Sequence, residues 1–298
     1  MRQNRRQFLK TSAAIASGLL LNGSLAGCSR RHSVRVNGHL WIYASKFPPN
    51  WDSTPVLDQV FSDFKYAGIE GVELMEVNLR RPDAIANIGA LIEKHDLPVT
   101  GSSYNADMWD RTQQQKIIED VEFVVERLSE LGGKNFGITV GDARRKKTEE
   151  ELDAQGEVLS EILKICKKKD VLPNMHNHTF EVKDNLHDLK GTVSRVPDLK
   201  LGPDLNWLIR GGVDPVSFIK TYGNKIVYLH IRDQRKDGLW TEYVGEGVTD
   251  FQAIATALKD ARFNGEVAIE LASDEPPKNP MKENWKKSRE YVREVFGW

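Results

Sequence analysis

Cysteine is scarce in this chain of 298 residues, which contains two, Cys28 and Cys166. Cys166 ends the apolar segment 162–166, where it is expected to lie in a helix core. Two cysteines allow at most one internal disulfide. The sequence therefore excludes a small fold held together by disulfides.

Neither sign of charge is in excess. Lys and Arg number 42 and Asp and Glu number 43, a formal net charge of −1, which gives no general reason to expect a nucleic-acid partner. The basic clusters 144–147 and 167–169 are typical of solvated helix ends. With 40% hydrophobic and 29% charged residues, the composition fits a soluble globular protein of one large or two small domains.

A long hydrophobic run is missing from the first 30 residues, where the weakly apolar run 11–21 is too short for a spanning helix. Arg5 and Arg6 precede this run in a pattern that resembles the twin-arginine export signal. The run is followed by Leu-Ala-Gly-Cys at 25–28, which resembles the bacterial lipobox. A basic start, a short apolar centre and small residues at the end predict a cleavable signal over residues 1–27.

This resemblance implies cleavage before Cys28, which then carries the lipids. We expect export by the twin-arginine machinery, which carries folded proteins, and a periplasmic lipoprotein held at a membrane by this anchor. Removal of the signal takes away four basic residues and leaves 38 basic against 43 acidic residues, a mature charge of −5.

The remaining chain has no Pro/Gly/Ser-rich linker and no glycine-rich phosphate loop after its first expected strand. After a spacer at 28–37, short apolar runs alternate with longer amphipathic ones. Strands are expected at 40–44, 71–74, 98–102, 135–140, 171–176, 199–205, 225–231 and 266–271, and helices at 54–66, 83–95, 111–131, 148–169, 186–196, 215–222, 250–261 and 283–296. Eight such units predict a single (β/α)8 TIM barrel domain over 38–298, with a doubly wound open sheet as the alternative.

One stretch combines a strand with groups that ligate metals or move protons. His176 and His178 are two positions apart, so that on a strand both side chains would point to the same face, and Glu181 follows where the strand should have ended. Such groups are costly to bury unless they have partners. Other strands end in the same way, with Glu73, Asp204, His230 and Glu270.

In a barrel these strand ends converge on one face. Two imidazoles and two carboxylates from the last four strands predict a divalent metal site formed by His176, Asp204, His230 and Glu270. Mixed histidine and carboxylate ligation suits Mn²⁺, Co²⁺, Zn²⁺, Fe²⁺ or Ni²⁺ better than Mg²⁺. The identity of the metal stays open.

Six short motifs, in this order, resemble the sugar phosphate isomerase/epimerase superfamily of xylose isomerase-like TIM barrels. They are GVEL at 71–74, HNHTFE at 176–181, GPDLNW at 202–207, LHIRD at 229–233, GEG at 245–247 and AIE at 268–270. In that family four ligands, usually Glu, Asp, His and Glu, hold the metal. The last three fall on Asp204, His230 and Glu270, and the first falls on His176, where many relatives have Glu.

The resemblance implies proton removal beside a carbonyl through an enediolate, with two carboxylates as proton carriers. Only Glu270 clearly remains of that pair, and the second carrier could be Glu181, His178 or Glu73. A single base also suits β-elimination from a keto sugar. Residues expected to contact the substrate are Glu73, Trp207, Arg232, Asp233 and Trp240.

We therefore expect a metal-dependent isomerase or epimerase. An exported enzyme is expected to act on an unphosphorylated sugar or keto sugar, because phosphorylated sugars are held in the cytoplasm. The close alternative is a lyase or hydrolase of 3-keto-glycosides that uses the same chemistry. A non-catalytic sugar-binding lipoprotein and a metal-dependent endonuclease complete the alternatives, and export and the acidic mature charge weigh against the endonuclease.

Overall fold

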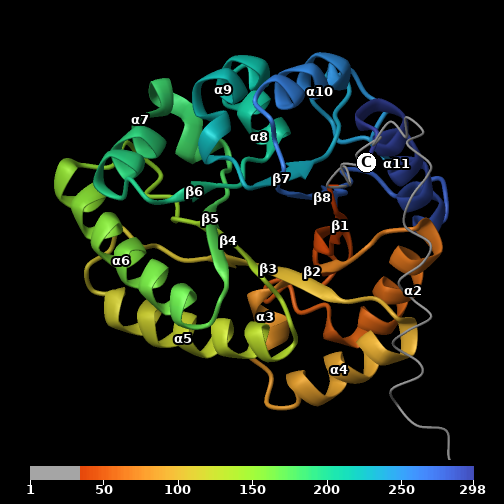
Figure 1. Ribbon diagram of the computed structural model, residues 1–298, viewed down its shortest axis with the longest axis horizontal. Coiled ribbons are helices and arrows are strands. Elements are labelled where there is room, and N and C mark those ends of the chain that lie inside the picture. The colour runs from red at the N-terminus through yellow and green to blue at the C-terminus, as the bar shows by residue number, and fades with distance from the viewer. Residues whose placement is uncertain (1–33) are drawn as a thin grey trace, which may run out of the picture. The chain divides into compact units, whose positions relative to one another are not determined.

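Eight parallel strands surrounded by helices form a nearly closed barrel (Figure 1). This computed structural model describes residues 34–298, so the predicted signal over 1–27 and the predicted lipid attachment at Cys28 lie outside the described residues. The strands are β1 (Val36–His39), β2 (Val72–Met75), β3 (Val99–Asn105), β4 (Asn135–Thr139), β5 (Leu172–Met175), β6 (Lys200–Leu201), β7 (Tyr228–Ile231) and β8 (Glu266–Glu270).

The helices follow the strands along the chain and cover the outside of the sheet (Figure 1). They are α1 (Trp41–Ala44), η1 (Thr54–Val56), α2 (Leu57–Ala67), α3 (Glu76–Leu79), α4 (Ala84–His95), α5 (Gln114–Glu130), α6 (Glu149–Lys168), α7 (Thr179–Arg195), α8 (Leu205–Arg210), α9 (Pro215–Tyr222), η2 (Gly223–Lys225), α10 (Phe251–Asp260) and α11 (Met281–Phe296). Among the described helices, none combines the length and the hydropathy needed to cross a bilayer.

The sheet runs in the order β6-β5-β4-β3-β2-β1-β8-β7, with every neighbouring pair parallel. Between β6 and β7 two isolated parallel bridges, Leu201 to Ile226 and Asp204 to His230, bring the ends of the sheet together. The predicted barrel is therefore confirmed, and the open doubly wound sheet is not what this chain forms.

The first strand lies earlier than predicted. Residues 40–44, expected as a strand, belong to the loop residue Leu40 and to α1, whereas β1 begins at Val36 inside the predicted spacer. A short apolar run does not distinguish a strand from a buried helical turn, and here Ile42, Tyr43 and Ala44 are buried on α1. The consequence is functional, because β1 ends at His39, which pairs in register with Glu73 and Glu270.

Capping residues mark where several helices begin. At α6 the Thr148 hydroxyl accepts from the backbone N–H of Glu151, and the Glu151 carboxylate accepts from the backbone N–H of Thr148. At α8 the predicted sixth strand stops after two residues, and Asp204 caps the helix instead. Both helices therefore start where the chain leaves the carboxyl end of the sheet.

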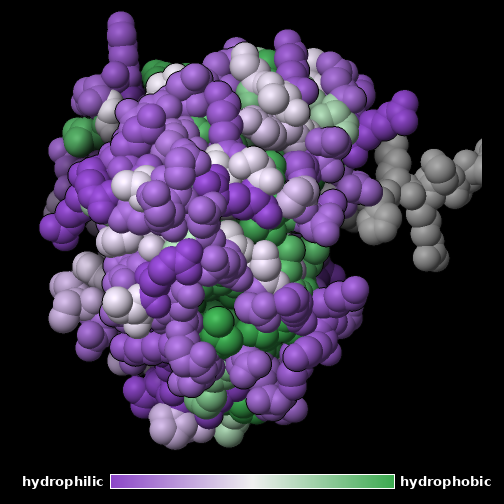
Figure 2. All heavy atoms as spheres, turned by 90° about the vertical axis from the view of Figure 1, so that its left-hand side faces the viewer, coloured by the Kyte–Doolittle hydropathy of each residue, from purple (hydrophilic) through white to green (hydrophobic). Residues whose placement is uncertain are grey.

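The hydrophobic core fills the space between the sheet and the helices. Trp285 on α11 is fully buried, lies edge-on to Phe64 with ring centroids 4.5 Å apart, and donates its indole N–H to the Tyr43 hydroxyl at 3.0 Å. On the side that carries α6 and α7 the surface is mostly hydrophilic and is interrupted by a hollow with hydrophobic side chains (Figure 2). A group of buried polar side chains lies at the end of the barrel where the strands finish.

Candidate metal centre

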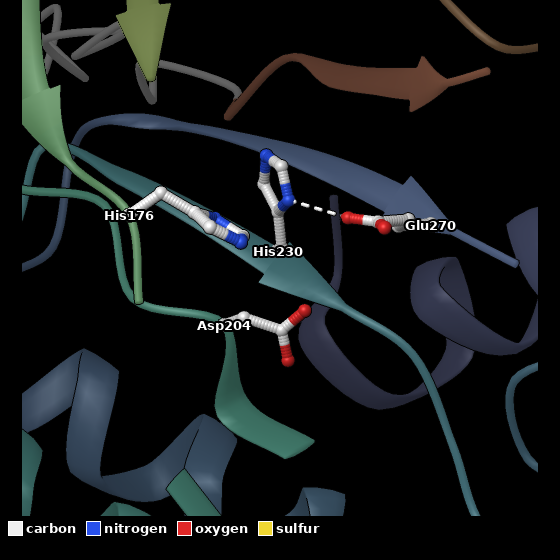
Figure 3. A group of neighbouring side chains, drawn as sticks. All are labelled: His176, Asp204, His230 and Glu270. Atoms are coloured by element: carbon white, nitrogen blue, oxygen red, sulfur yellow. Dashed lines mark hydrogen bonds and ion pairs between the residues drawn. The ribbon is translucent and has the colours of Figure 1, made fainter. Parts of the chain in front are cut away.

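His176, Asp204, His230 and Glu270 meet at the carboxyl end of the barrel (Figure 3). Each offers one potential ligand atom, and these four atoms lie within 4.8 Å of one another. His176 directly follows β5, Asp204 follows β6, His230 lies on β7 and Glu270 ends β8. All four side chains are buried. The structure thus brings together the four residues that the sequence analysis assigned to one cation.

The Asp204 carboxylate is held in place by the helix that it caps. Its Oδ1 accepts from the backbone N–H groups of Asn206 at 2.9 Å and Trp207 at 3.0 Å. These two bonds fix the orientation of the carboxylate, and its Oδ2 forms an ion pair with the Arg232 Nε at 2.8 Å. One oxygen is therefore structural and the other points into the cluster.

His230 lies between two carboxylates. Its Nδ1 is 2.7 Å from Glu270 Oε2, and its Nε2 is 2.9 Å from Glu73 Oε2. Burial lowers the pKa of His230, but Glu73 and Glu270 outweigh it and raise that pKa to about 10. Burial raises the pKa of Glu270, and Arg232 and the histidines outweigh it, so that this pKa lies well below its usual value.

The four residues fit a divalent cation. Burial, together with the charges of His230 and His178, lowers the pKa of His176 well below its usual value, so its imidazole is neutral and has a lone pair for a metal. Its Nδ1 is buried without a hydrogen-bond partner, and Oδ2 of Asp204 is paired with the Arg232 guanidinium alone. Two imidazoles and two carboxylates are the donor set that a borderline divalent metal prefers, and a cation there would displace the proton that lies between His230 and Glu270.

Arg232 and two tryptophans border the cluster. The Arg232 guanidinium, 3% exposed, forms ion pairs with Asp204 and Glu270. It lies 5.5 Å from the ring of Trp207 and 5.0 Å from the ring of Trp240. Trp207 and Trp240 pack edge to face, with ring centroids 5.3 Å apart. These three predicted substrate contacts therefore form one wall beside the cluster.

Asp233, also predicted to contact the substrate, organises the loop after β7. Its carboxylate accepts from the backbone N–H groups of Gly245 at 3.0 Å, Gly247 at 2.8 Å and Thr249 at 3.3 Å. A Cβ at Gly247 would lie 2.3 Å from the carbonyl oxygen of Gln234, so only glycine fits there. The loop is built around this buried carboxylate, which has no oxygen left to reach toward the cluster.

Glu73, predicted as a substrate contact or proton carrier, lies inside the barrel beneath His230. Its carboxylate accepts from the Tyr228 hydroxyl at 2.9 Å and contacts the His230 Nε2 at 2.9 Å. The side chain is 1% exposed. This position is that of a group that orients a ligand, since metal-bound histidines generally donate their second N–H to a carboxylate or carbonyl.

Glu181 and His178, the other predicted proton carriers, differ in whether their polar atoms already have hydrogen-bond partners. The Glu181 carboxylate is fully buried and accepts from the backbone N–H groups of Val140 at 3.2 Å and His178 at 2.6 Å. Burial raises the pKa of Glu181 well above its usual value. The His178 ring has a buried Nδ1 without a partner and lies 5.1 Å from His176, centroid to centroid. Burial, followed by the charge of Arg232, lowers the pKa of His178 to about 4.

His39 is a member of the site that the sequence analysis missed. Its Nδ1 lies 3.8 Å from Glu270 Oε1, and its ring centroid is 5.3 Å from that of His230. The same Nδ1 accepts from the backbone N–H of Trp41 at 3.2 Å, and Nε2 contacts the Ser103 hydroxyl at 3.1 Å. The alternation of Val34 and Val36 before His39 is the signal that could have placed a strand end there.

Comparisons with known proteins agree with this architecture. The family model for the xylose isomerase-like TIM barrel matches residues 61–295. The inosose dehydratase of Clostridium perfringens is 24% identical over 282 residues, covering 83% of this chain and 92% of that protein. The inosose dehydratase of Bacillus cereus is 23% identical over 286 residues, covering 84% and 93%.

Among solved structures, the D-allulose 3-epimerase of a Methylomonas species in complex with D-allulose superimposes with a TM-score of 0.72 at 17% identity, covering 88% of this chain and 97% of that one. The 3-keto-D-glucoside 4-epimerase of E. coli superimposes with a TM-score of 0.68 at 15% identity, covering 88% of this chain and 100% of that one. At these identities the likeness is one of fold.

Proposed function

The chain belongs to the xylose isomerase-like TIM barrel family, and from that premise we propose that it is a divalent-metal-dependent isomerase or epimerase of an unphosphorylated sugar or keto sugar. The observation that carries the proposal is the buried cluster of His176, Asp204, His230 and Glu270, whose potential ligand atoms lie within 4.8 Å of one another. A cation held there, whether Mn²⁺, Co²⁺, Zn²⁺, Fe²⁺ or Ni²⁺, would supply Lewis-acid polarisation of the substrate carbonyl.

Glu270 is the first proton carrier in this proposal. Its pKa lies well below the usual value, so the carboxylate is ionised at neutral pH and can accept a proton from the carbon beside a carbonyl. The hydrogen bond to His230 and the ion pair with Arg232 fix its orientation. The base therefore occupies a defined position at the end of β8.

His178 is the second proton carrier in this proposal. The carboxylates of Glu181 and Glu73 and both ring nitrogens of His39 are already engaged, whereas the buried Nδ1 of His178 has no partner. With a pKa of about 4, the His178 imidazole is neutral at neutral pH. His178 follows β5 and Glu270 ends β8, so the two carriers approach the cluster from different strands, as proton transfer at two faces of a substrate requires.

The charges beside the cluster support an unphosphorylated substrate. Arg232 is engaged by the carboxylates of Asp204 and Glu270. Arg210 donates to Gln234 and to the carbonyl of Gly238, and lies 3.4 Å from the ring of Trp240. With these two guanidinium groups engaged, we assign no phosphate clamp to this wall. The solved D-allulose 3-epimerase complex holds an unphosphorylated ketose, which agrees with this choice.

A second candidate is β-elimination from a 3-keto-glycoside. It is favoured by the imidazole of His176 at the first ligand position, where many relatives have a carboxylate, so that Glu270 would act as a single base. Glu270 would take the proton beside the ketone, the C–O bond to the aglycone would break, and the departing oxygen would take its proton from water while the ring N–H of neutral His178 donates a hydrogen bond to it. The inosose dehydratase relatives and the 3-keto-D-glucoside 4-epimerase neighbour carry names of related chemistry.

We also propose that the enzyme is exported by the twin-arginine machinery and held at a membrane by lipids on Cys28. The support is the sequence of residues 5–10 and 25–28. An exported enzyme would have access to soluble carbohydrates outside the cytoplasm, in agreement with an unphosphorylated substrate.

The metal-loaded enzyme, incubated in deuterium oxide with ketoses and with 3-keto-glycosides of a chromogenic aglycone, tests both reactions. Deuterium in a recovered sugar with no bond cleavage identifies the epimerase or isomerase, and release of the aglycone identifies the lyase. His178→Gln is expected to lose most of the exchange or release. His187→Gln, a matched change at a histidine that contacts the Lys147 carbonyl, is expected to keep it. A loaded protein that does neither, yet binds sugar, would contradict both reactions and support a non-catalytic binding protein.

A further inference from the structure

We propose that the amino-terminal end of the barrel, where the strands begin, rests on an anionic membrane surface, so that the metal centre faces away from the lipid. The contact region is a groove of about 730 Å³ at that end, next to the beginnings of β5 and β6. Five basic residues and two acidic ones line it: Lys134, Lys164, Lys167, Arg195, Lys200, Asp170 and Asp198. We call it the basic groove.

The basic groove combines positive charge with exposed apolar atoms. Leu172 at its floor is 40% exposed, beside Pro173. Basic side chains around apolar ones are the composition that binds the interface of an anionic bilayer.

Two of the lysines have no partner that would neutralise them. Lys134 pairs with Asp170 at 2.6 Å, and Lys164 and Arg195 also have acidic partners. Within residues 34–298, no carboxylate lies within 4.0 Å of the ammonium groups of Lys167 or Lys200. Their charge remains available to an external anion.

Helix dipoles explain the position of only some of the lysines in the basic groove. Lys167 lies in the last turn of α6, where a cation complements the carbonyl end of the helix. Lys134 and Lys200 lie at the beginnings of strands β4 and β6, where no helix terminus explains them. Because the mature chain carries a net charge of −5, a local excess of basic residues is needed for any approach to an anionic surface.

The short segment between Cys28 and the barrel also favours an orientation in which the amino-terminal end of the barrel faces the membrane. Five residues separate Cys28 from Val34, and the six Cα–Cα steps between them span at most about 20 Å. β1 begins at Val36, and because all eight strands are parallel, β5 and β6 begin at the same end of the barrel. A lipid on Cys28, which is itself a proposal of this work, would therefore hold the basic groove rather than the metal centre toward the bilayer.

Energy transfer from single labels to a rhodamine lipid tests this orientation. The full chain with Cys28→Ser has no thiol to acylate at that position, so the face is tested independently of the anchor, and Cys166 is fully buried. One label is placed at Asp198→Cys in the basic groove and another at Val248→Cys, 61% exposed in the loop after β7. Vesicles of phosphatidylglycerol with phosphatidylethanolamine are compared with vesicles of phosphatidylcholine.

We expect strong transfer from the Asp198→Cys label, weak transfer from the Val248→Cys label, and binding that requires phosphatidylglycerol and weakens with salt. Lys167→Ala with Lys200→Ala should weaken binding about 30-fold, since each basic residue near such a surface contributes about fivefold. Lys236→Ala with Lys278→Ala, in loops at the opposite end, serves as the matched control and should leave binding unchanged. Equal transfer from both labels, equal loss in both double variants, or indifference to phosphatidylglycerol would overturn the proposal.

Discussion

Replacing Asp204 by Asn isolates the charge that this residue brings to the metal centre. The substitution keeps the Oδ1 atom that accepts from the backbone N–H groups of Asn206 and Trp207, and Asn caps helices about as well as Asp. It removes the negative charge on Oδ2, the oxygen that faces Arg232 and the cluster. Cation binding should therefore weaken while the start of α8 is preserved.

The size of the effect follows from the linkage between binding and folding. A cation present at 100 times its dissociation constant stabilises the native enzyme by about 2.7 kcal/mol. At about 2–4 °C per kcal/mol for a chain of this size, the unfolding midpoint should rise by about 5–11 °C. If Asp204→Asn weakens binding about 100-fold, at the upper end of what outer-shell changes cost, the same concentration yields about 0.4 kcal/mol, or about 1–2 °C.

The assay compares thermal unfolding of each variant with and without the metal, so that any change in intrinsic stability cancels. Asp214→Asn is the matched control, because Asp214 also caps a helix, accepting from the backbone N–H of Ser217 at 2.9 Å, but lies exposed at the start of α9. The control should show the full metal-dependent shift. If Asp204→Asn kept more than half of the shift of the unaltered enzyme, the reasoning that Asp204 ligates the cation would be refuted.

Four further outcomes are expected. Glu73→Gln should weaken metal affinity about 10–100-fold in titration calorimetry, because Glu73 orients His230, and unchanged affinity would exclude that role. Trp285→Ala should lower the free energy of unfolding by about 3–5 kcal/mol in denaturant titrations, and a loss below about 1 kcal/mol would contradict its place in the core. Gly247→Ala should lower activity with little change in circular dichroism, since its Cβ would collide with the Gln234 carbonyl oxygen, and full activity would show that the loop does not shape the site. Desolvation raises the pKa of Glu242, but hydrogen bonds from the backbone N–H groups of Lys278 and Asn279 outweigh it and lower that pKa to about 2. The stability that Glu242 contributes is present above its unfolded pKa of 4.5 and is lost as the pH falls toward about 2. Glu242→Gln should therefore flatten the acid unfolding curve between these two pH values, as followed by circular dichroism. An unchanged curve would argue against the lowered pKa.

The barrel and the four clustered residues could be predicted from the sequence because both depend on local pattern. Eight alternating apolar runs specify strand ends, and parallel strands of a barrel bring their ends to one face, so His176, Asp204, His230 and Glu270 could be grouped before any coordinates. The first strand was placed wrongly because a run of five apolar residues fits a buried helical turn equally well. His39 was missed for that reason.

The roles of the other acidic residues could not be predicted, because they depend on what each carboxylate finds across the fold. Glu181 meets the backbone N–H of Val140, 41 positions away, and Glu73 meets Tyr228, 155 positions away. Asp233 is surrounded by N–H groups of its own loop. A sequence shows that an acid follows a strand, but not whether its oxygens are already engaged.

A crystal structure of the metal-loaded enzyme, with diffraction measured on both sides of the absorption edge of the added metal, tests the assignment of the metal centre most directly. We predict one anomalous peak per chain, within ligand distance of His176, Asp204, His230 and Glu270, and a peak of about half that height in Asp204→Asn crystals soaked at 100 times the dissociation constant of the unaltered enzyme. A peak bound elsewhere, or no peak beside these four side chains at saturating metal, would contradict the assignment.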